Sequence, residues 1–286
     1  MQHALENHLK TGSTTVCWAW LVRRRDGETL GFTDHDCDLT FDGVLFAARS
    51  GLTAGVLEKT NGMAVDNTEV LGALSDASVR EEDILAGRYD GAEVVTYLVN
   101  WVNVNERSVL FRGTFGEMTR SQGSFRVELR GLTEALNVRH GRVYHAECGA
   151  VLGDAQCKVD LTAPAMSVIV PAQAVLEGRV IHVPALAEYS EGWFADGQLL
   201  IHTGIGKGQS GRIKSDTTVG QIRIVEMWQS FGVRPQAGDQ MRLVAGCDRR
   251  ASTCRQKFDN FLNFRGFPHI PGEDWMRSNP SKSGRR

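Results

Sequence analysis

The sequence lacks the segments that would place it in a membrane or direct it out of the cell. No stretch approaches the roughly 18 uninterrupted apolar residues of a membrane-spanning helix, and the N-terminal MQHALENHLKTGSTT has no apolar core of the signal-peptide kind. Proline is scarce, at 7 of 286 residues, and 42% of the chain is hydrophobic, which excludes collagen-like and disordered chains. We therefore expect a folded protein, made in the cytoplasm and without stable membrane association.

Nor does the chain carry an excess of positive charge. Its 32 basic and 34 acidic residues give a net charge of -2, which excludes the strongly basic balance of a dedicated nucleic-acid binder. The charge is unevenly distributed, because acidic residues predominate in residues 1–140 and basic residues in residues 141–286. This asymmetry predicts two ends of the molecule that meet different neighbours.

The common local signatures of hydrolases are also missing, since the chain has neither a G-x-S-x-G elbow nor an H-E-x-x-H helix. Partial matches to other site motifs lack the residues that their chemistry needs: a glycine-rich run at Gly206, Gly208 and Gly211, an H-x-E at His145 and Glu147, and alternating acids at Asp34, Asp36 and Asp38. We interpret them as a hairpin turn, a structural histidine and a polar turn.

What the sequence does have is apolar alternation with period two, which predicts β-strands. It begins at Val16, turns at Asp26-Gly27 and Asp42-Gly43, and continues to about residue 137, with one helix-like interruption at 77–86 and a turn at Gln122-Gly123. A second series of short strands runs from residue 167 to residue 244. Helical spacing returns at Cys254, Phe258, Phe261 and Leu262.

These patterns predict a mainly β protein, with two small antiparallel β domains and a short helical C-terminal segment. We place the boundaries at 1–163 for the first domain with its cysteine pair, 164–246 for the second β domain, and 247–286 for the C-terminal helical segment and basic tail. The aromatic residues after Cys254 predict a core or a subunit interface there, in which Pro268, Pro271 and Gly272 end the helix and Trp275 contributes an anchor.

Four of the six cysteines form a candidate ligand set. Cys148 and Cys157 enclose eight residues and Cys247 and Cys254 enclose six, in segments with little strand pattern. Structural zinc sites use tighter C-x₂₋₄-C turns, whereas an iron-sulfur cube accepts wider loops. Spacing alone leaves three interpretations open: an iron-sulfur cluster, a zinc ion, or buried thiols without a metal.

Basic residues surround these cysteines in the sequence, namely Lys158, Arg249, Arg250, Arg255 and Lys257. Their positive charge would offset that of an anionic cluster. We also expect it to lower the pKa values of the four thiols.

The cysteine spacing C-x₈-C followed by C-x₆-C, with the closing run CDRRASTCRQKFDNFLNFRGFPHIPGEDW at 247–275, resembles the tail hub (tail tip) family of long-tailed bacteriophages and gene transfer agents, which includes lambda-type tail tip protein L. The segments LGFTDHDCDLTFDGVLF at 30–46 and GWFADGQLLIHTGIGKGQSGRI at 192–213 resemble the same family, most closely its gene-transfer-agent branch. The resemblance covers nearly the whole chain.

This resemblance implies a non-enzymatic structural protein at the distal end of a tail tube, assembled as a homotrimer around the channel through which DNA leaves without sequence-specific binding. It implies as neighbours a distal tail protein ring, a central tip or fibre protein and a tail peptidase. The protein would be made in the bacterial cytoplasm and become part of a phage-like particle.

The resemblance further implies a 4Fe-4S cluster held by Cys148, Cys157, Cys247 and Cys254, with zinc as the alternative metal; Cys17 and Cys37 have no counterpart in the motif. Such a cluster would pin the C-terminal segment across a whole intervening domain and so remove conformational freedom from the unfolded chain. Two rival functions are an iron-sulfur redox enzyme and a tail-associated cell-wall hydrolase. The sequence contains no second cofactor site for the first and no hydrolase motif for the second.

Overall fold

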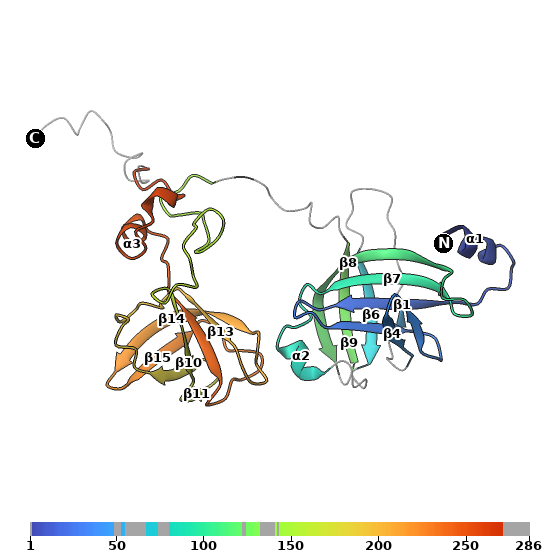
Figure 1. Ribbon diagram of the computed structural model, residues 1–286, viewed down its shortest axis with the longest axis horizontal. Helices are drawn as coiled ribbons and strands as arrows, with labels where there is room; N and C mark the ends of the chain where they lie inside the picture. The colour runs from blue at the N-terminus through green and yellow to red at the C-terminus, as the bar shows by residue number, and fades with distance from the viewer. Residues whose placement is uncertain are drawn as a thin grey trace, which may run out of the picture. The chain divides into compact units, whose positions relative to one another are not determined.

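The computed structural model describes residues 2–48, 53–54, 67–73, 80–121, 124–131, 141 and 143–270 of the chain. The chain divides into two compact units, Met1–Arg139 and His140–Arg286 (Figure 1). Each unit contains a sheet built almost entirely from antiparallel pairs, so the prediction of a mainly β protein with two antiparallel β domains is confirmed. None of the helices in the described ranges has the length and apolar character needed to cross a bilayer.

The first unit contains a sheet of nine strands within its described residues, in the order β3-β4-β2-β1-β7-β8-β9-β6-β5. Its elements are α1 (Gln2–Leu9), β1 (Val16–Arg23), β2 (Thr29–Thr33), β3 (Leu39–Phe41), β4 (Val44–Ala47), β5 (Thr53–Ala54), β6 (Asn67–Ala73), α2 (Glu81–Leu85), β7 (Glu93–Asn100), β8 (Arg107–Ser121) and β9 (Ser124–Gly131). The predicted turn at Gln122-Gly123 lies outside the described residues. We call residues 16–131 the first β domain.

The period-two pattern of β1 places apolar side chains on both faces of this sheet. Trp20 and Val22 belong to one buried cluster, whereas Cys17, Ala19 and Leu21 belong to another on the opposite face. Between β3 and β4 the chain reverses at Asp42 and Gly43, whose φ angles of 51° and 74° are those of a tight two-residue hairpin turn. The sheet therefore follows the alternation in the sequence closely.

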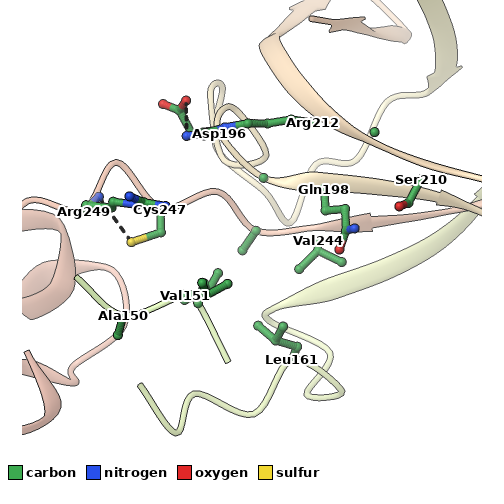
Figure 2. Close-up of a pocket in the computed structure, with 14 residues that line it drawn as sticks. Ala150, Val151, Leu161, Asp196, Gln198, Ser210, Arg212, Val244, Cys247 and Arg249 are labelled. Carbon is green, nitrogen blue, oxygen red and sulfur yellow. Dashed lines mark hydrogen bonds and ion pairs between the residues drawn. The ribbon is translucent and has the colours of Figure 1, made fainter. Parts of the chain in front are cut away.

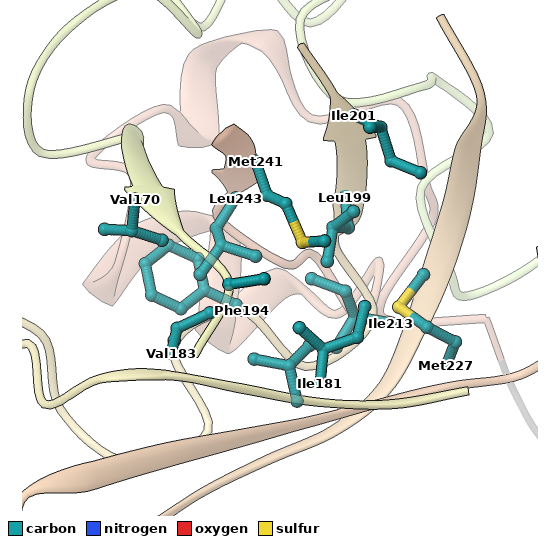
Figure 3. Close-up of a cluster of buried hydrophobic side chains, with 12 residues drawn as sticks. Val170, Ile181, Val183, Phe194, Leu199, Ile201, Ile213, Met227, Met241 and Leu243 are labelled. Atoms are coloured by element: carbon teal, nitrogen blue, oxygen red, sulfur yellow. The ribbon is translucent and has the colours of Figure 1, made fainter. Parts of the chain in front are cut away.

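The second unit contains a sheet of seven strands within its described residues, in the order β10-β16-β13-β14-β15-β12-β11. The strands are β10 (Ser167–Pro171), β11 (Ala174–Leu176), β12 (Val180–Pro184), β13 (Gln198–Ile201), β14 (Ser210–Val219), β15 (Ile222–Met227) and β16 (Gln240–Val244). The end strand β10 also lies near β12, so the sheet curls around its core. Figure 3 shows that core, which is made of large apolar side chains such as Phe194, Met227 and Leu243. We call residues 167–244 the second β domain.

The C-terminal segment is less helical than its apolar spacing predicts. Helix α3 (Ala251–Gln256) ends before Phe258, and a separate single 3₁₀ turn, η2, follows at Phe261–Asn263. Between them Asp259 has a φ of 45°, which a continuous helix does not accommodate. The aromatic residues therefore do not form one helical stripe: Phe261 stacks on Phe264, and Leu262 is 96% exposed. Pro271, Gly272, Trp275 and the basic tail lie outside the described residues.

The division into two units differs from the predicted boundaries at 163 and 246. The segment that carries Cys148 and Cys157 belongs to the second unit, together with the C-terminal segment. Backbone hydrogen bonds explain this grouping, because the N–H of Cys148 donates to the carbonyl of Arg249 at 2.9 Å and the N–H of Phe267 donates to that of His145 at 2.9 Å. We call residues 145–159 and 247–267 the cysteine lobe.

Candidate metal centre

The four predicted ligand cysteines come together in the cysteine lobe. Cys148, Cys157, Cys247 and Cys254 line one small cavity, although about 90 residues separate the two pairs in sequence. Three of them are buried, and Cys247 is half-buried. The other walls of the cavity are mainly apolar, from Ala150, Leu152, Val159, Phe258 and Phe264. The arrangement is a pocket of thiols in dry surroundings.

Side-chain contacts fix the first cysteine pair. The carboxylate of Asp154 accepts hydrogen bonds from the backbone N–H groups of Val151, Gln156 and Cys157, at 2.9, 2.9 and 2.6 Å. The Asn260 side-chain amide donates to the carbonyl of Cys157 at 2.6 Å and therefore ties this turn to the C-terminal segment.

Close backbone approach fixes the second half of the lobe. A Cβ at position 266 would lie 2.5 Å from the carbonyl oxygen of Glu147, so only glycine fits where the two segments cross. Lys158 and Arg249 both have φ angles near 60° although neither is glycine, and such backbone strain persists only where surrounding contacts impose it. The cysteine-bearing turns are therefore held in place by the lobe as a whole.

N–H groups point at three of the four sulfur atoms. The backbone N–H of Arg265 donates to Sγ of Cys148 at 3.3 Å, and that of Arg249 donates to Sγ of Cys247 at 3.4 Å. The Asn260 amide lies 3.6 Å from Sγ of Cys157. Hydrogen bonds of this kind stabilise a negatively charged sulfur, which is the form in which cysteine binds a metal.

The expected lowering of the thiol pKa values is wrong for two of these cysteines. Burial raises the pKa of Cys254 to about 11, and the charges of Cys148, Cys247 and Cys157 add to the shift. Burial also raises the pKa of Cys247, despite the opposing Arg249 N–H. The nearby arginines do not reverse these shifts, because Arg249, Arg250 and Arg255 are exposed to solvent, which screens their charge. Burial therefore disfavours the thiolate forms of Cys247 and Cys254, and a positive charge placed beside these sulfurs would oppose that effect.

The donor set fits a four-iron cube. Within the described ranges, no three side chains of the His, Cys, Asp and Glu types lie close enough together to hold one single metal ion. A single zinc with four thiolates at about 2.3 Å would bring the sulfurs within about 3.8 Å of one another. In a four-iron cube each iron would take one thiolate, so the four ligand sulfurs would stand further apart than around a single zinc.

A second, larger pocket of about 400 Å³ lies between the cysteine lobe and the second β domain, and Cys247 lines both cavities. Figure 2 shows its polar rim, where Arg212 is paired with Asp196 at 3.1 Å, and the contact from Arg249 to the Cys247 sulfur. Cys247 is therefore the candidate ligand closest to solvent.

The other two cysteines, Cys17 and Cys37, belong to the first unit. Cys17 is buried in the first β domain, where its Sγ donates to the carbonyl of Val99 at 3.6 Å, and Cys37 is exposed. The acidic residues around Cys37 hold a turn: Asp34 accepts the N–H of Trp18 at 2.7 Å and Asp38 accepts that of Ala48 at 2.8 Å. Both contacts support the interpretation of this segment as a polar turn.

Sequence reasoning missed Asn260 and Asp154 as supports of the centre. The signal for Asp154 was available, because Asp side chains commonly accept hydrogen bonds from nearby backbone N–H groups in turns. Asn260 gave no such signal, since its contact to Cys157 spans 103 residues.

Comparison with known proteins gives two family matches. Residues 2–160 match the family described as "Baseplate hub protein, N-terminal attachment domain", and residues 192–274 match "Phage conserved hypothetical protein BR0599". Among solved structures, a chain from "Virion of native gene transfer agent (GTA) particle" is 49% identical, with a TM-score of 0.91 over 99% of this chain and 97% of that one. No curated protein matches the sequence.

Proposed function

Because this chain belongs to the baseplate hub protein family, we propose that it is a structural, non-enzymatic hub in the tail of a phage-like particle of the gene-transfer-agent kind. The observation that carries this proposal is the similarity, along nearly the full length of both chains, to a component of a gene transfer agent virion. In this role the protein is made in the bacterial cytoplasm and then built into the particle, where it contacts other virion proteins.

The hub forms a ring of three at the distal end of the tail tube and links the tube to the tail tip. Its neighbours are the distal tail protein ring, the central tip or fibre protein and the tail peptidase. Closure into a ring covers sheet edges that would otherwise pair with other chains. The excess of acidic residues in 1–140 suits a passage for DNA, because basic side chains on the wall would bind phosphates and retain the DNA.

Imaging of the native particle by electron microscopy tests this assignment. We expect density for both β domains at the distal end of the tail tube, in three copies. Purified particles that lack the protein would overturn the role, and one or six copies per tail would overturn the ring of three. Reductase or peptidoglycan-cleaving activity of the purified protein would contradict the non-enzymatic role and favour one of the two rival functions.

The hub carries a 4Fe-4S cluster on Cys148, Cys157, Cys247 and Cys254, with zinc as the alternative metal. The shared cavity, its apolar walls and the N–H groups aimed at three sulfurs support this assignment. When bound, the cluster supplies four metal–sulfur bonds that cross-link two segments far apart in sequence. The residues of the chain contribute the remaining effects: they exclude water, orient the sulfurs and stabilise their charge.

Purification without oxygen tests the cofactor separately from the role in the tail. We expect brown protein with broad absorbance at about 400 nm, and about four irons and four sulfides per chain, because four thiolates saturate one cube. Colourless protein with one zinc per chain would replace the cluster by zinc and leave the hub role standing.

A further inference from the structure

Lys257 is the least exposed Lys or Arg residue of the cysteine lobe. It follows α3 directly and lies three residues after Cys254. Of the five basic residues that the sequence places near the ligands, Lys158, Arg249, Arg250 and Arg255 are exposed, whereas Lys257 is half-buried. A charge away from bulk water acts more strongly on its neighbours, because it is less screened.

The ammonium group of Lys257 is held in one place. Its Nζ donates to the carbonyl of Trp193 at 2.5 Å and to that of Gly246 at 2.8 Å. It also faces the aromatic rings of Trp193 and Phe258, at 4.5 and 5.4 Å from their centroids. Since Gly246 precedes Cys247 directly, these contacts place the positive charge near Cys247.

The loop that presents Trp193 is fixed by a buried ion pair in the second β domain. Arg223 Nε lies 2.8 Å from Asp216 Oδ1, and both side chains are completely buried. Arg223 also donates to the carbonyl of Tyr189 at 3.0 Å, and Asp216 accepts the N–H of Phe194 at 2.9 Å. Both ends of the loop are therefore anchored, and its carbonyl groups cannot move freely away from Lys257.

The charges around Lys257 are negative. Burial lowers the pKa of Lys257, and the negative charges of Cys247, Asp248, Asp216 and Asp196 act against that lowering. Carbonyl groups that hold an ammonium group away from water do not supply a full negative charge, so its desolvation costs free energy. A nearby negative group offsets that cost. This environment of Lys257 is therefore suited to a site whose metal-bound sulfurs carry negative charge.

We propose that Lys257 is the half-buried counter-charge of the metal centre and that Trp193 and Gly246 position its ammonium group. This inference rests on the cluster described under Proposed function. A fixed positive charge favours the more negative, reduced form of a thiolate-bound cluster and so raises its reduction potential. Lys257 is a positioning residue in this account and is not a ligand.

The test compares full-length protein, purified without oxygen, with three variants. Lys257→Met removes the charge at similar length, Lys257→Arg keeps it, and Arg255→Met is the matched control, because Arg255 is exposed and lies over the Phe261 ring at 4.2 Å. The readouts are iron per chain and the midpoint potential in a redox titration followed by electron paramagnetic resonance. We expect a more negative potential in Lys257→Met, a potential near that of the parent protein in Lys257→Arg, and no shift in Arg255→Met.

An unchanged potential in iron-loaded Lys257→Met would overturn the proposal, and so would an equal shift in Arg255→Met. If Lys257→Met retains no cluster, the iron content of Lys257→Arg tests the proposal instead. Iron retained in Lys257→Arg supports a need for the positive charge, and iron lost from that variant overturns the proposal. Parent protein without iron would instead refute the cluster on which the proposal rests. That outcome is distinct from failure of the Lys257 assignment alone.

Discussion

The second β domain and the cysteine lobe are neighbours within one unit, yet they differ in how many apolar side chains they bury. The β domain buries twelve residues in a continuous apolar cluster, including Phe194 and Leu243. The buried cluster of the lobe contains only Cys148, Ala150 and Cys157. A region with so little apolar burial gains too little free energy to offset its loss of conformational entropy, so we expect it to depend on a metal cross-link.

Loss of one ligand is the change with the largest expected effect on this contrast. Serine at any one of Cys148, Cys157, Cys247 and Cys254 should lower bound iron and melting temperature by similar amounts and give defective tails, since each thiolate supplies one bond to the same cluster. Iron analysis, thermal melting and particle yield measure these effects. Cys17→Ser and Cys37→Ser are controls, with iron unchanged and a cost on the order of 1 kcal/mol or less.

Equal iron in all six single mutants would remove the cluster assignment. Lost iron with stable, normal tails would leave the ligands correct but contradict the dependence of the lobe on its metal.

The buried ion pair of the second β domain gives the next largest effect. Asp216→Ala leaves the completely buried Arg223 without its counter-charge, which should lower the free energy of unfolding by about 3–5 kcal/mol. The matched control is Asp196→Ala, because the pair of Asp196 with Arg212 is solvent-exposed and should contribute about 1 kcal/mol or less. Chemical denaturation measures both. Equal costs would mean that burial of the pair does not matter.

Truncation of the apolar core tests whether the second β domain is stabilised by packing. Leu243→Ala should cost about 2–5 kcal/mol, because Leu243 is completely buried and the change leaves a cavity (Figure 3). Leu176→Ala, at a half-exposed site in β11, should cost about 0.5 kcal/mol or less. Iron per folded chain should stay unchanged in both variants. If Leu243→Ala lost as much iron as the ligand mutants, packing of the β domain and metal binding by the lobe would not be separate sources of stability.

The smallest expected effect concerns Cys17 and Cys37, the two cysteines outside the proposed ligand set. Burial raises the pKa of Cys17 to about 11, with a contribution from Asp34. Maleimide labelling at pH 8 should therefore be fast at exposed Cys37 and slow at Cys17. An unfolded cysteine thiol ionises at about pH 8.5, whereas Cys17 in the folded protein ionises only at about pH 11. Between these two pH values ionisation favours the unfolded state, so the first β domain should lose stability as the pH rises. Mass spectrometry of labelled peptides and melting from pH 8 to 11 measure these effects, and equal labelling rates would contradict them.

The sequence was informative where a local pattern carries the information. Alternation that begins at Val16 predicted strand β1, because successive side chains of a strand point to opposite faces of the sheet, and the structure shows that both faces of β1 are buried. Asp42-Gly43 predicted a hairpin, since both residues accept the positive φ angles that the turn requires. Helical spacing after Cys254 was misleading, because the apolar residues there pack in small separate contacts around the left-handed residue Asp259.

The sequence by itself determined the strand order along the chain, the two cysteine pairs and the family resemblance. Only the tertiary structure decided what lies around the four sulfurs. It placed the first cysteine pair, Cys148 and Cys157, in the second unit. It also showed that burial and the repulsion between neighbouring sulfurs raise the pKa of Cys254, although basic residues lie close to it in the sequence. It left Lys257 half-buried, whereas the other four nearby cations are exposed. The physical reason is that dielectric screening and hydrogen bonding depend on distance and burial in three dimensions, which spacing along the chain does not specify.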